Sequence, residues 1–275
     1  MRSNLSLEIR GVSKSYCVNG STLLALDDVS FTVEPGEFVT ILGASGCGKS
    51  TLLRLIIGLD ADYRGDILLE GERVAGPGAD RSIVFQEARL LPWLTIEQNV
   101  ALGLDASGTP AAMSKRIAAE QLKRVQLAGF ERAYPHQLSG GMAQRAAIAR
   151  ALVSQPKVLL LDEPLGALDS QTRAYMQEQL LSLWRREGIT IVMVTHDIEE
   201  AVYLSDKIVV MEPSPGRVRG ILPIEWAHSR DRGSARFARL KERIVRMLMK
   251  DAGSEPAFVD PFSEDVARYP ALFGG

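Results

Sequence analysis

Apolar and polar positions follow two alternating periods along most of the chain, one typical of strands and one of amphipathic helices. Residues 5–12 and 23–33 alternate between apolar and polar positions, as half-buried strands do. Residues 37–43 and 189–196 are short apolar runs, which are typical of strands buried on both faces. Because strands and helices alternate in this way, we predict an α/β fold with a mainly parallel central sheet and an N-terminal antiparallel β layer.

Helical patterns separate the predicted strands. Thr95 and Gln98 form a capping-box pattern, and Pro110 opens an amphipathic pattern that continues to residue 130. Residues 88–155 as a whole are helical in character and interrupt the series of strands, so we expect an inserted helical subdomain there. The remaining predictions are helices over 49–58, 170–188 and 198–204, and strands over 157–164, 207–211 and 217–224.

The composition changes after Trp226. Residues 228–253 are charged and amphipathic, which predicts a single helix followed by a loose tail. We therefore expect a main domain over residues 1–225 and a C-terminal helical tail over 226–275.

Charge and cysteine content narrow the class of protein. The 275 residues carry 32 Lys and Arg against 34 Asp and Glu, a net charge of −2, so no basic field indicates a nucleic-acid partner. The two cysteines, Cys17 and Cys47, are too few for a disulfide framework. No apolar run approaches the roughly 20 residues that span a bilayer, and the first residues lack a secretion leader. We expect a cytoplasmic chain that, if it works at a membrane, docks onto another protein.

A glycine-rich loop follows the strand predicted over 37–43. Its sequence, GASGCGKST, matches the pattern G-x-x-x-x-G-K-[ST] between a strand and a helix. In such a loop successive backbone N–H groups converge on phosphate oxygens at a helix N-terminus. We predict that Lys49 neutralises the β- and γ-phosphates, that Ser50 places its hydroxyl on Mg²⁺, and that Thr51 reaches an α-phosphate oxygen. Cys47 occupies a free position of the pattern and is expected to be a small filler. The expected nucleotide-binding residues of the loop are Gly43, Ala44, Ser45, Gly46, Cys47, Gly48, Lys49, Ser50 and Thr51.

Two adjacent carboxylates end the apolar strand predicted over 157–164. Phosphoryl transfer to water requires Mg²⁺ held in place and an oriented water molecule. Because neighbouring side chains at a strand end point in different directions, Asp162 and Glu163 can divide these tasks. We expect Asp162 to hold the coordination shell of the metal and Glu163 to polarise the water.

The segment LSGGMAQR, residues 138–145, is a second glycine-rich helix start. With the loop and the acid pair, it makes the first 220 residues or so resemble the ATP-hydrolysing subunit of ATP-binding cassette (ABC) transporters, whose signature motif it matches. The resemblance implies that two copies pack head to tail and that Ser139, Gly140 and Gly141 of each copy cap the γ-phosphate of the ATP bound by the other. The positive end of the following helix suits that role.

Four further positions match residues of the same family. The resemblance implies that Gln86 contacts Mg²⁺ and the attacking water, with the metal also held by Ser50 and, through water, by Asp162. It implies that His196 contacts the γ-phosphate as the switch histidine. Asp169 matches the aspartate that crosses the dimer interface, and Tyr16 matches an aromatic residue that stacks on adenine.

The branch of the family is predicted from several segments. VFQEARLLPWLTIEQNV, PHQLSGGMAQR and DEPLGALDSQTR most resemble importers of nitrate, sulfonate or taurine. Aliphatic sulfonate or taurine is the preferred solute, while nitrate, cyanate and a pyrimidine remain alternatives. The implied partners are a second copy of the chain, two membrane permease subunits and a solute-binding protein, without nucleic acid. The chain would lie peripherally on the cytoplasmic face of the inner membrane.

Other classes of protein fit the sequence less well. The apolar stretch after Gln86, which includes Trp93, could form a groove for a permease helix or could be ordinary core. A non-transport ABC ATPase of DNA repair would separate its motifs with a long coiled coil, and one of translation would carry two cassettes. A P-loop small-molecule kinase would leave LSGGMAQR, His196 and Asp169 without a role.

Overall fold

A six-stranded sheet forms the centre of the molecule in the computed structural model, which describes residues 6–18, 20–166 and 168–249. The strand order is β10-β9-β3-β8-β7-β6, and every neighbouring pair is parallel except β10 with β9. The predicted parallel sheet is therefore confirmed. Its strands are β3 (Phe38–Leu42), β6 (Arg81–Val84), β7 (Val158–Asp162), β8 (Thr190–Thr195), β9 (Lys207–Glu212) and β10 (Arg217–Pro223).

Alternate residues of each central strand enter two separate cores. On β3, Phe38 and Leu42 pack with α4, α5, α6 and α7, whereas Val39 and Ile41 pack with α1 and the second sheet. All residues of β3 and β8 are buried, because both faces of the sheet are covered. The helices are α1 (Lys49–Ile56), α4 (Gly140–Leu152), α5 (Ser170–Glu187), α6 (Ile198–Leu204) and α7 (Ala235–Met249).

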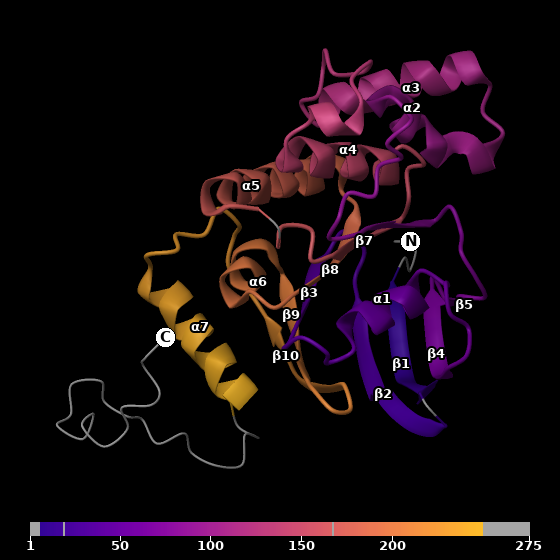
Figure 1. Cartoon of the computed structure of the whole chain (residues 1–275). Coiled ribbons are helices and arrows are strands. Elements are labelled where there is room, and N and C mark those ends of the chain that lie inside the picture. Colours follow the sequence, from indigo (N-terminus) through magenta and orange to yellow (C-terminus); the bar gives the residue numbers. More distant parts are fainter. Residues whose placement is uncertain (1–5, 19, 167, 250–275) are drawn as a thin grey trace, which may run out of the picture.

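Four strands between residues 7 and 73 form the predicted antiparallel layer. Its order is β2-β1-β4-β5, and all its neighbouring strands pair antiparallel. Figure 1 shows this layer at the lower right, with α1 beside it. The strands are β1 (Leu7–Val18), β2 (Ser21–Val33), β4 (Arg64–Leu69) and β5 (Glu72–Arg73), and of these β4 and β5, with β6 of the central sheet, had not been predicted from the sequence.

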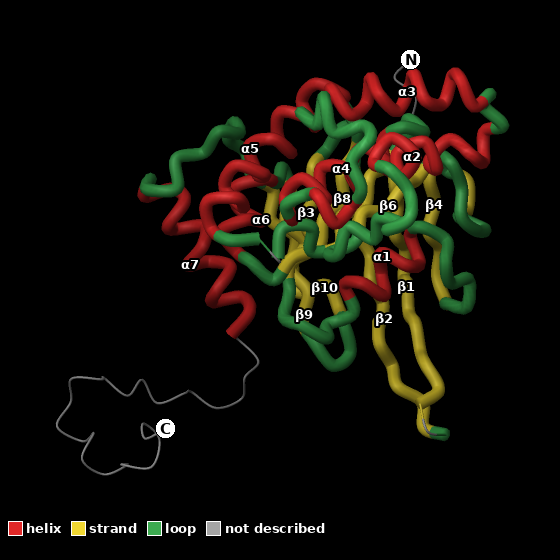
Figure 2. The backbone as a smooth tube through the Cα atoms, turned by 45° about the horizontal axis from the view of Figure 1, so that its top comes forward, coloured by secondary structure: helices red, strands yellow, loops and turns green. Residues whose placement is uncertain are grey.

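The helical region lies at the opposite end of the molecule and has a small core of its own (Figures 1 and 2). It contains α2 (Ile96–Ala101), the 3₁₀ helix η1 (Leu102–Ser107), α3 (Ala111–Arg124), the 3₁₀ helix η2 (Pro135–Gln137) and α4. The capping box of Thr95 and Gln98 is present. Residues 88–155, expected to be helical in character, form several short helices separated by turns. The positive φ of Gln126, 58°, ends the pattern that was expected to continue to residue 130.

The C-terminal helix begins later than predicted. The expected helix over 228–253 begins only at Ala235, because residues before it form a turn. Ser229 has a φ of 68°, and the Ser234 hydroxyl accepts a hydrogen bond from the Phe237 amide, as an N-cap does. The predicted residues 250–253 and the loose tail lie outside the described residues. Within the described part of the chain, no helix has the length and apolar character needed to cross a bilayer.

Candidate nucleotide-binding site

The glycine-rich loop connects the end of β3 to the start of α1. Gly46 and Gly48 have φ values of 81° and 89°, a region that favours glycine. A Cβ on Gly43 would lie 2.6 Å from Cys47 Sγ and 2.9 Å from the Met211 carbonyl oxygen. The pattern of glycines in the motif therefore follows from the tight path of the backbone.

Lys49 lies inside this loop. Its Nζ donates hydrogen bonds to the carbonyl oxygens of Gly43 and Ala44, at 2.8 and 2.9 Å. The same ammonium group is 3.9 Å from Glu163 Oε1. The side chain is buried, so its positive charge is held at the N-terminus of α1, where an anion would bind.

Ser50 and Asp162 meet at the edge of the sheet. The Ser50 hydroxyl donates to Asp162 Oδ1 at 2.9 Å. Burial raises the pKa of the Asp162 carboxyl, although the Ser50 hydrogen bond and the charge of Lys49 act in the opposite direction. A hydroxyl and a carboxylate are the hard oxygen ligands that Mg²⁺ prefers, and Mg²⁺ takes its other ligands from phosphates and water. The hydroxyl of Ser50 and the carboxylate of Asp162 therefore fit Mg²⁺.

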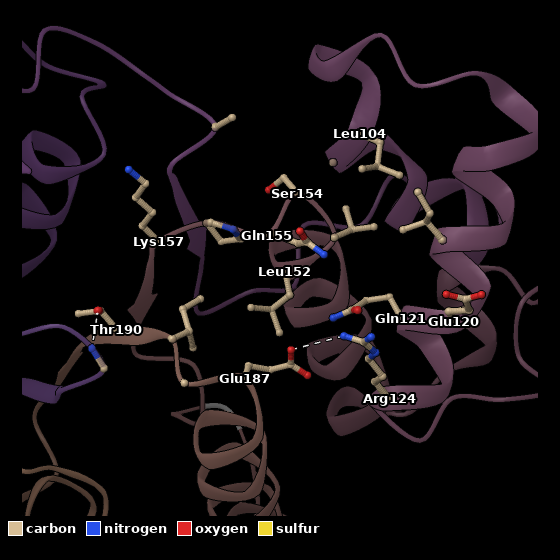
Figure 3. A pocket seen from close by; sticks show the side chains of 18 of the residues that line it. Leu104, Glu120, Gln121, Arg124, Leu152, Ser154, Gln155, Lys157, Glu187 and Thr190 are labelled. Carbon is tan, nitrogen blue, oxygen red and sulfur yellow. Dashed lines mark hydrogen bonds and ion pairs between the residues drawn. The ribbon is translucent and has the colours of Figure 1, made fainter. Parts of the chain in front are cut away.

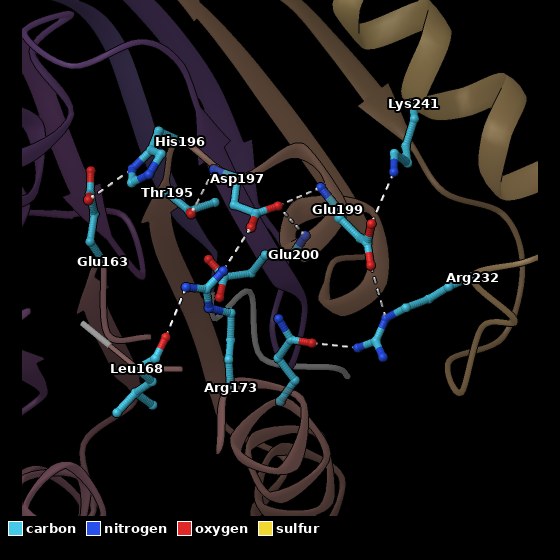
Figure 4. Close-up of polar contacts among 11 residues, drawn as sticks. Glu163, Leu168, Arg173, Thr195, His196, Asp197, Glu199, Glu200, Arg232 and Lys241 are labelled. Carbon is cyan, nitrogen blue, oxygen red and sulfur yellow. Dashed lines mark hydrogen bonds and ion pairs between the residues drawn. The ribbon is translucent and has the colours of Figure 1, made fainter. Parts of the chain in front are cut away.

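Glu163 and His196 form a second pair beside the loop, shown in Figure 4. His196 Nδ1 lies 3.0 Å from Glu163 Oε2. The backbone of Glu163 is left-handed, with a φ of 45°, which is uncommon for a residue other than glycine and is often found at functional sites. Gln86 is also close, because a Cβ on Gly166 would lie 3.4 Å from Gln86 Nε2 and 3.5 Å from the Glu163 carbonyl oxygen.

A cavity of about 570 Å³ opens over the loop. Tyr16 lines it, as the expected contact with adenine requires. Leu23 and Leu24 also line it and are 57% and 38% exposed. These leucines, with Ser214 and Pro215, were missed from the sequence, where Leu23 and Leu24 were assigned only to a strand. Apart from them, the lining consists of Ala25, Ser45, Gly46, Gly48, Lys49, Ser50, Thr51 and Glu163.

The signature residues do not line this cavity. Ser139 is the N-cap of α4, and its hydroxyl accepts a hydrogen bond from the Met142 amide at 3.3 Å. Ser139 and Gly140 are exposed, and a Cβ on Gly141 would lie 3.0 Å from Thr172 Cγ2. The helix start is therefore accessible from outside the chain but is not part of the cavity over the P-loop.

Asp169 caps α5. Its Oδ1 accepts hydrogen bonds from the amides of Gln171 and Thr172, both at 3.1 Å, and the hydrogen bonds with Thr172 lower the pKa of the carboxyl. Asp169 is exposed, like Ser139.

Cys47 is buried beneath the loop, and burial raises the pKa of its thiol. Its thiol is thus a packing group, in agreement with the prediction of a small filler.

A larger cavity, of about 720 Å³, lies elsewhere (Figure 3). It is between the helical region and the opposite edge of the central sheet, near Leu104, Arg124 and Thr190. None of the predicted site residues lines it.

A strand, a glycine-rich loop with an enclosed lysine, and a neighbouring strand that ends in two carboxylates together define a P-loop nucleotide-binding protein. The ABC transporter family matches residues 26–166. An uncharacterized ABC transporter ATP-binding protein of Methanocaldococcus jannaschii is 47% identical over 247 residues, which cover 90% of this chain and 92% of the relative.

Two relatives have names that specify a solute. The aliphatic sulfonates import ATP-binding protein SsuB of Bacillus subtilis is 43% identical, over 89% of this chain and 94% of its own length. The nitrate import ATP-binding protein NrtD of Synechocystis is 47% identical, over 80% of this chain and 83% of its own. A dimeric ATP-binding cassette solved in a post-hydrolysis state with ADP and phosphate superposes with a TM-score of 0.71 at 33% identity, covering 80% of this chain and all of that one.

The chain belongs to the ABC transporter family of ATP-binding cassettes. It binds ATP and is an ATPase of that family.

Proposed function

We propose that this chain is the energy-coupling ATPase subunit of an ABC import complex for an aliphatic sulfonate or taurine. The observation that carries the ATPase part of the proposal is the cluster around the P-loop, where Glu163 lies 3.9 Å from Lys49 and 3.0 Å from His196. The names of the SsuB relatives support the solute class. Nitrate is the second candidate, because NrtD is a relative of comparable identity.

The proposed ATP site is shared between two copies packed head to tail. One copy supplies the P-loop, and Tyr16 stacks on the adenine. Its partner supplies Ser139, Gly140 and Gly141, whose exposed helix start would direct a hydroxyl, backbone amides and the positive end of α4 toward the γ-phosphate. Asp169, exposed at the start of α5, would cross the same interface. Hydrolysis then depends on closure of the dimer.

Each side chain around the P-loop has a separate task in the proposed hydrolysis. Glu163 orients the attacking water and accepts its proton, and His196, within hydrogen-bond distance of Glu163, steadies the γ-phosphate. Lys49 neutralises the charge of the phosphates. Ser50, Gln86 and, through water, Asp162 would hold Mg²⁺, which when bound neutralises charge on the phosphate oxygens.

The proposed partners are two permease subunits and a solute-binding protein, with the chain peripheral on the cytoplasmic face of the inner membrane. Trp93, 69% exposed beside the helical region, offers an aromatic contact for a permease helix. In this arrangement residues 1–225 are the ATPase domain, with the helical subdomain inserted at about 88–155, and residues 226–275 are a tail. The separate core of the helical region supports its treatment as a subdomain.

The test of the catalytic proposal is ATP hydrolysis by the full chain. Glu163→Gln should lower the hydrolysis rate on the order of 100-fold or more, while binding of a fluorescent ATP analogue in Mg²⁺ persists. Glu72→Gln, on the exposed strand β5, is the matched control and should hydrolyse ATP normally. Normal hydrolysis by Glu163→Gln would overturn the role of that carboxylate.

The solute is tested on the chain assembled with its permease and binding protein. The ATPase rate of this complex is measured once with taurine and once with nitrate. Stimulation by nitrate alone would favour the second candidate.

A further inference from the structure

The segment 226–249 contacts α6, the short helix that directly follows His196. We call this segment the C-terminal clamp; it comprises the loop after Trp226 and the helix α7. Figure 1 shows α7 beside α6, and Phe237 and Ile244 of α7 are buried in the same core as Ala201 of α6. The C-terminal clamp therefore packs on an element next to the ATP site.

The clamp contacts the first turn of α6 through Glu199. Lys241 Nζ donates to Glu199 Oε2 at 3.0 Å, and Arg232 Nε lies 3.6 Å from Glu199 Oε1 (Figure 4). These side chains are between 34% and 47% exposed, so each pair contributes little to the stability of the fold.

The clamp also binds the last turn of α6. Arg230 is only 5% exposed, and its Nη1 donates to the carbonyl oxygens of Val202, Tyr203 and Ser205 at 2.7, 3.2 and 2.8 Å. The final carbonyls of a helix have no partners within it, so the guanidinium acts as a cap. Burial lowers the pKa of Arg230 to about 10, which leaves the side chain cationic at neutral pH.

The loop between β8 and α6, which contains His196 and Asp197, also contacts α5. Arg173 Nη2 donates to the Leu168 carbonyl oxygen at 2.9 Å, and Arg173 Nη1 lies 3.6 Å from Asp197 Oδ2. Asp197 in turn caps α6, because its Oδ1 accepts from the amides of Glu199 and Glu200 at 2.8 and 3.1 Å. The loop with His196 is thus fixed between α5 and a helix of only seven residues, which needs tertiary contacts to hold its place.

We propose that the C-terminal clamp is a positioning element of the ATPase. Lys241 is a positioning residue that acts through Glu199 and keeps His196 within hydrogen-bond distance of Glu163. Arg232 acts through Glu199 as well, and it also holds the clamp by donating to Gln177 Oε1 at 2.5 Å and by lying over the Tyr203 ring. The proposal rests on the proposed function, in which His196 contacts the γ-phosphate. A small displacement of α6 would break the 3.0 Å contact between His196 and Glu163 without changing the P-loop, which lies between β3 and α1.

The main test compares the double variant Arg232→Gln/Lys241→Gln with the unaltered full chain in steady-state ATP hydrolysis. We expect kcat to fall about tenfold, less than the roughly 100-fold that a 1 Å misplacement can cause. We expect KM for ATP to stay unchanged, because the P-loop is not altered. The melting temperature should fall slightly, because Arg232→Gln also removes contacts with Gln177 and with the Tyr203 ring. The matched control is Arg243→Gln, an exposed residue two positions from Lys241 that faces away from it on α7.

A double-mutant cycle separates positioning through Glu199 from a general effect of charge. Glu199→Gln alone should lower kcat to a similar extent, and adding Lys241→Gln should then cause no further loss. Additive losses, an unchanged kcat in the double variant, or a parallel rise in KM would each overturn the proposal. His196→Ala is measured beside them. If it loses activity while the clamp variants do not, the clamp proposal alone fails; if it hydrolyses ATP normally, the proposed role of His196 fails first.

Discussion

Gly216, at the turn before β10, packs directly against the P-loop. Its amide donates to the Ala25 carbonyl oxygen at 3.0 Å and its carbonyl accepts from the Asp27 amide at 2.9 Å, so its position is fixed from two directions. A Cβ at Gly216 would lie 2.2 Å from the Cys47 carbonyl oxygen, in the loop itself. Because the obstructing atom belongs to the backbone, a side-chain rotation cannot relieve the clash in Gly216→Ala.

The expected effect of Gly216→Ala follows from that distance. The loop would have to move by about 1 Å or more to restore ordinary contact, and overpacking of this kind costs about 1 to 3 kcal/mol. Without ATP the loop can relax away from the new methyl group, but ATP requires the loop amides in their original places. The strain then appears in binding and should weaken ATP affinity by about 5- to 150-fold.

The assay is a titration with a fluorescent ATP analogue, together with thermal melting. Gly220→Ala is the matched control on β10, since its Cβ would meet only the flexible end of Met247, at 2.6 Å from Cε. This control should bind ATP as the unaltered chain does. Unchanged affinity in Gly216→Ala would refute the argument that this glycine sets the shape of the P-loop.

Two further predictions concern buried ionisable groups. In the native protein a maleimide should label the exposed Cys17 and leave Cys47 unmodified until denaturant is added, as mass spectrometry can show; rapid native labelling of Cys47 would contradict its burial. Burial also raises the pKa of Glu200, so the folded protein binds its proton more tightly than the unfolded chain and loses stability as pH rises through that raised pKa. Glu200→Gln, which imitates the protonated acid, should therefore raise the melting temperature at pH 7, and the gain should shrink as pH falls below the usual glutamate range; a gain independent of pH would contradict this reasoning.

Local chemistry made part of the site predictable. The P-loop is a continuous segment whose glycines and lysine shape and contact the backbone of the same loop. Lys49 and Gly48 could therefore be assigned from their spacing. Ser50 and Asp162 were each expected beside Mg²⁺, but their direct contact joins segments 112 positions apart and was not predicted.

Features that depend on tertiary contacts were not predictable in the same way. β4, with the sequence RGDILL, is too short and irregular to show a strand period. The helix was expected from residue 228 because the charged, amphipathic pattern begins there. The pattern does not show that Ser234 caps the helix, which begins only at Ala235. The capping of α6 by Arg230 has no sequence signal, since the guanidinium reaches carbonyls 25 to 28 positions away.

The most direct test of the shared ATP site is the oligomeric state of Glu163→Gln, measured by light scattering with and without ATP and Mg²⁺. We predict a shift from monomer to dimer that requires ATP and is abolished when Ser139→Arg is added. The long side chain at the exposed N-cap of α4 would then occupy the space of the γ-phosphate of the ATP bound by the other copy. A chain that binds ATP but stays monomeric, also in the presence of its permease, would contradict the shared site.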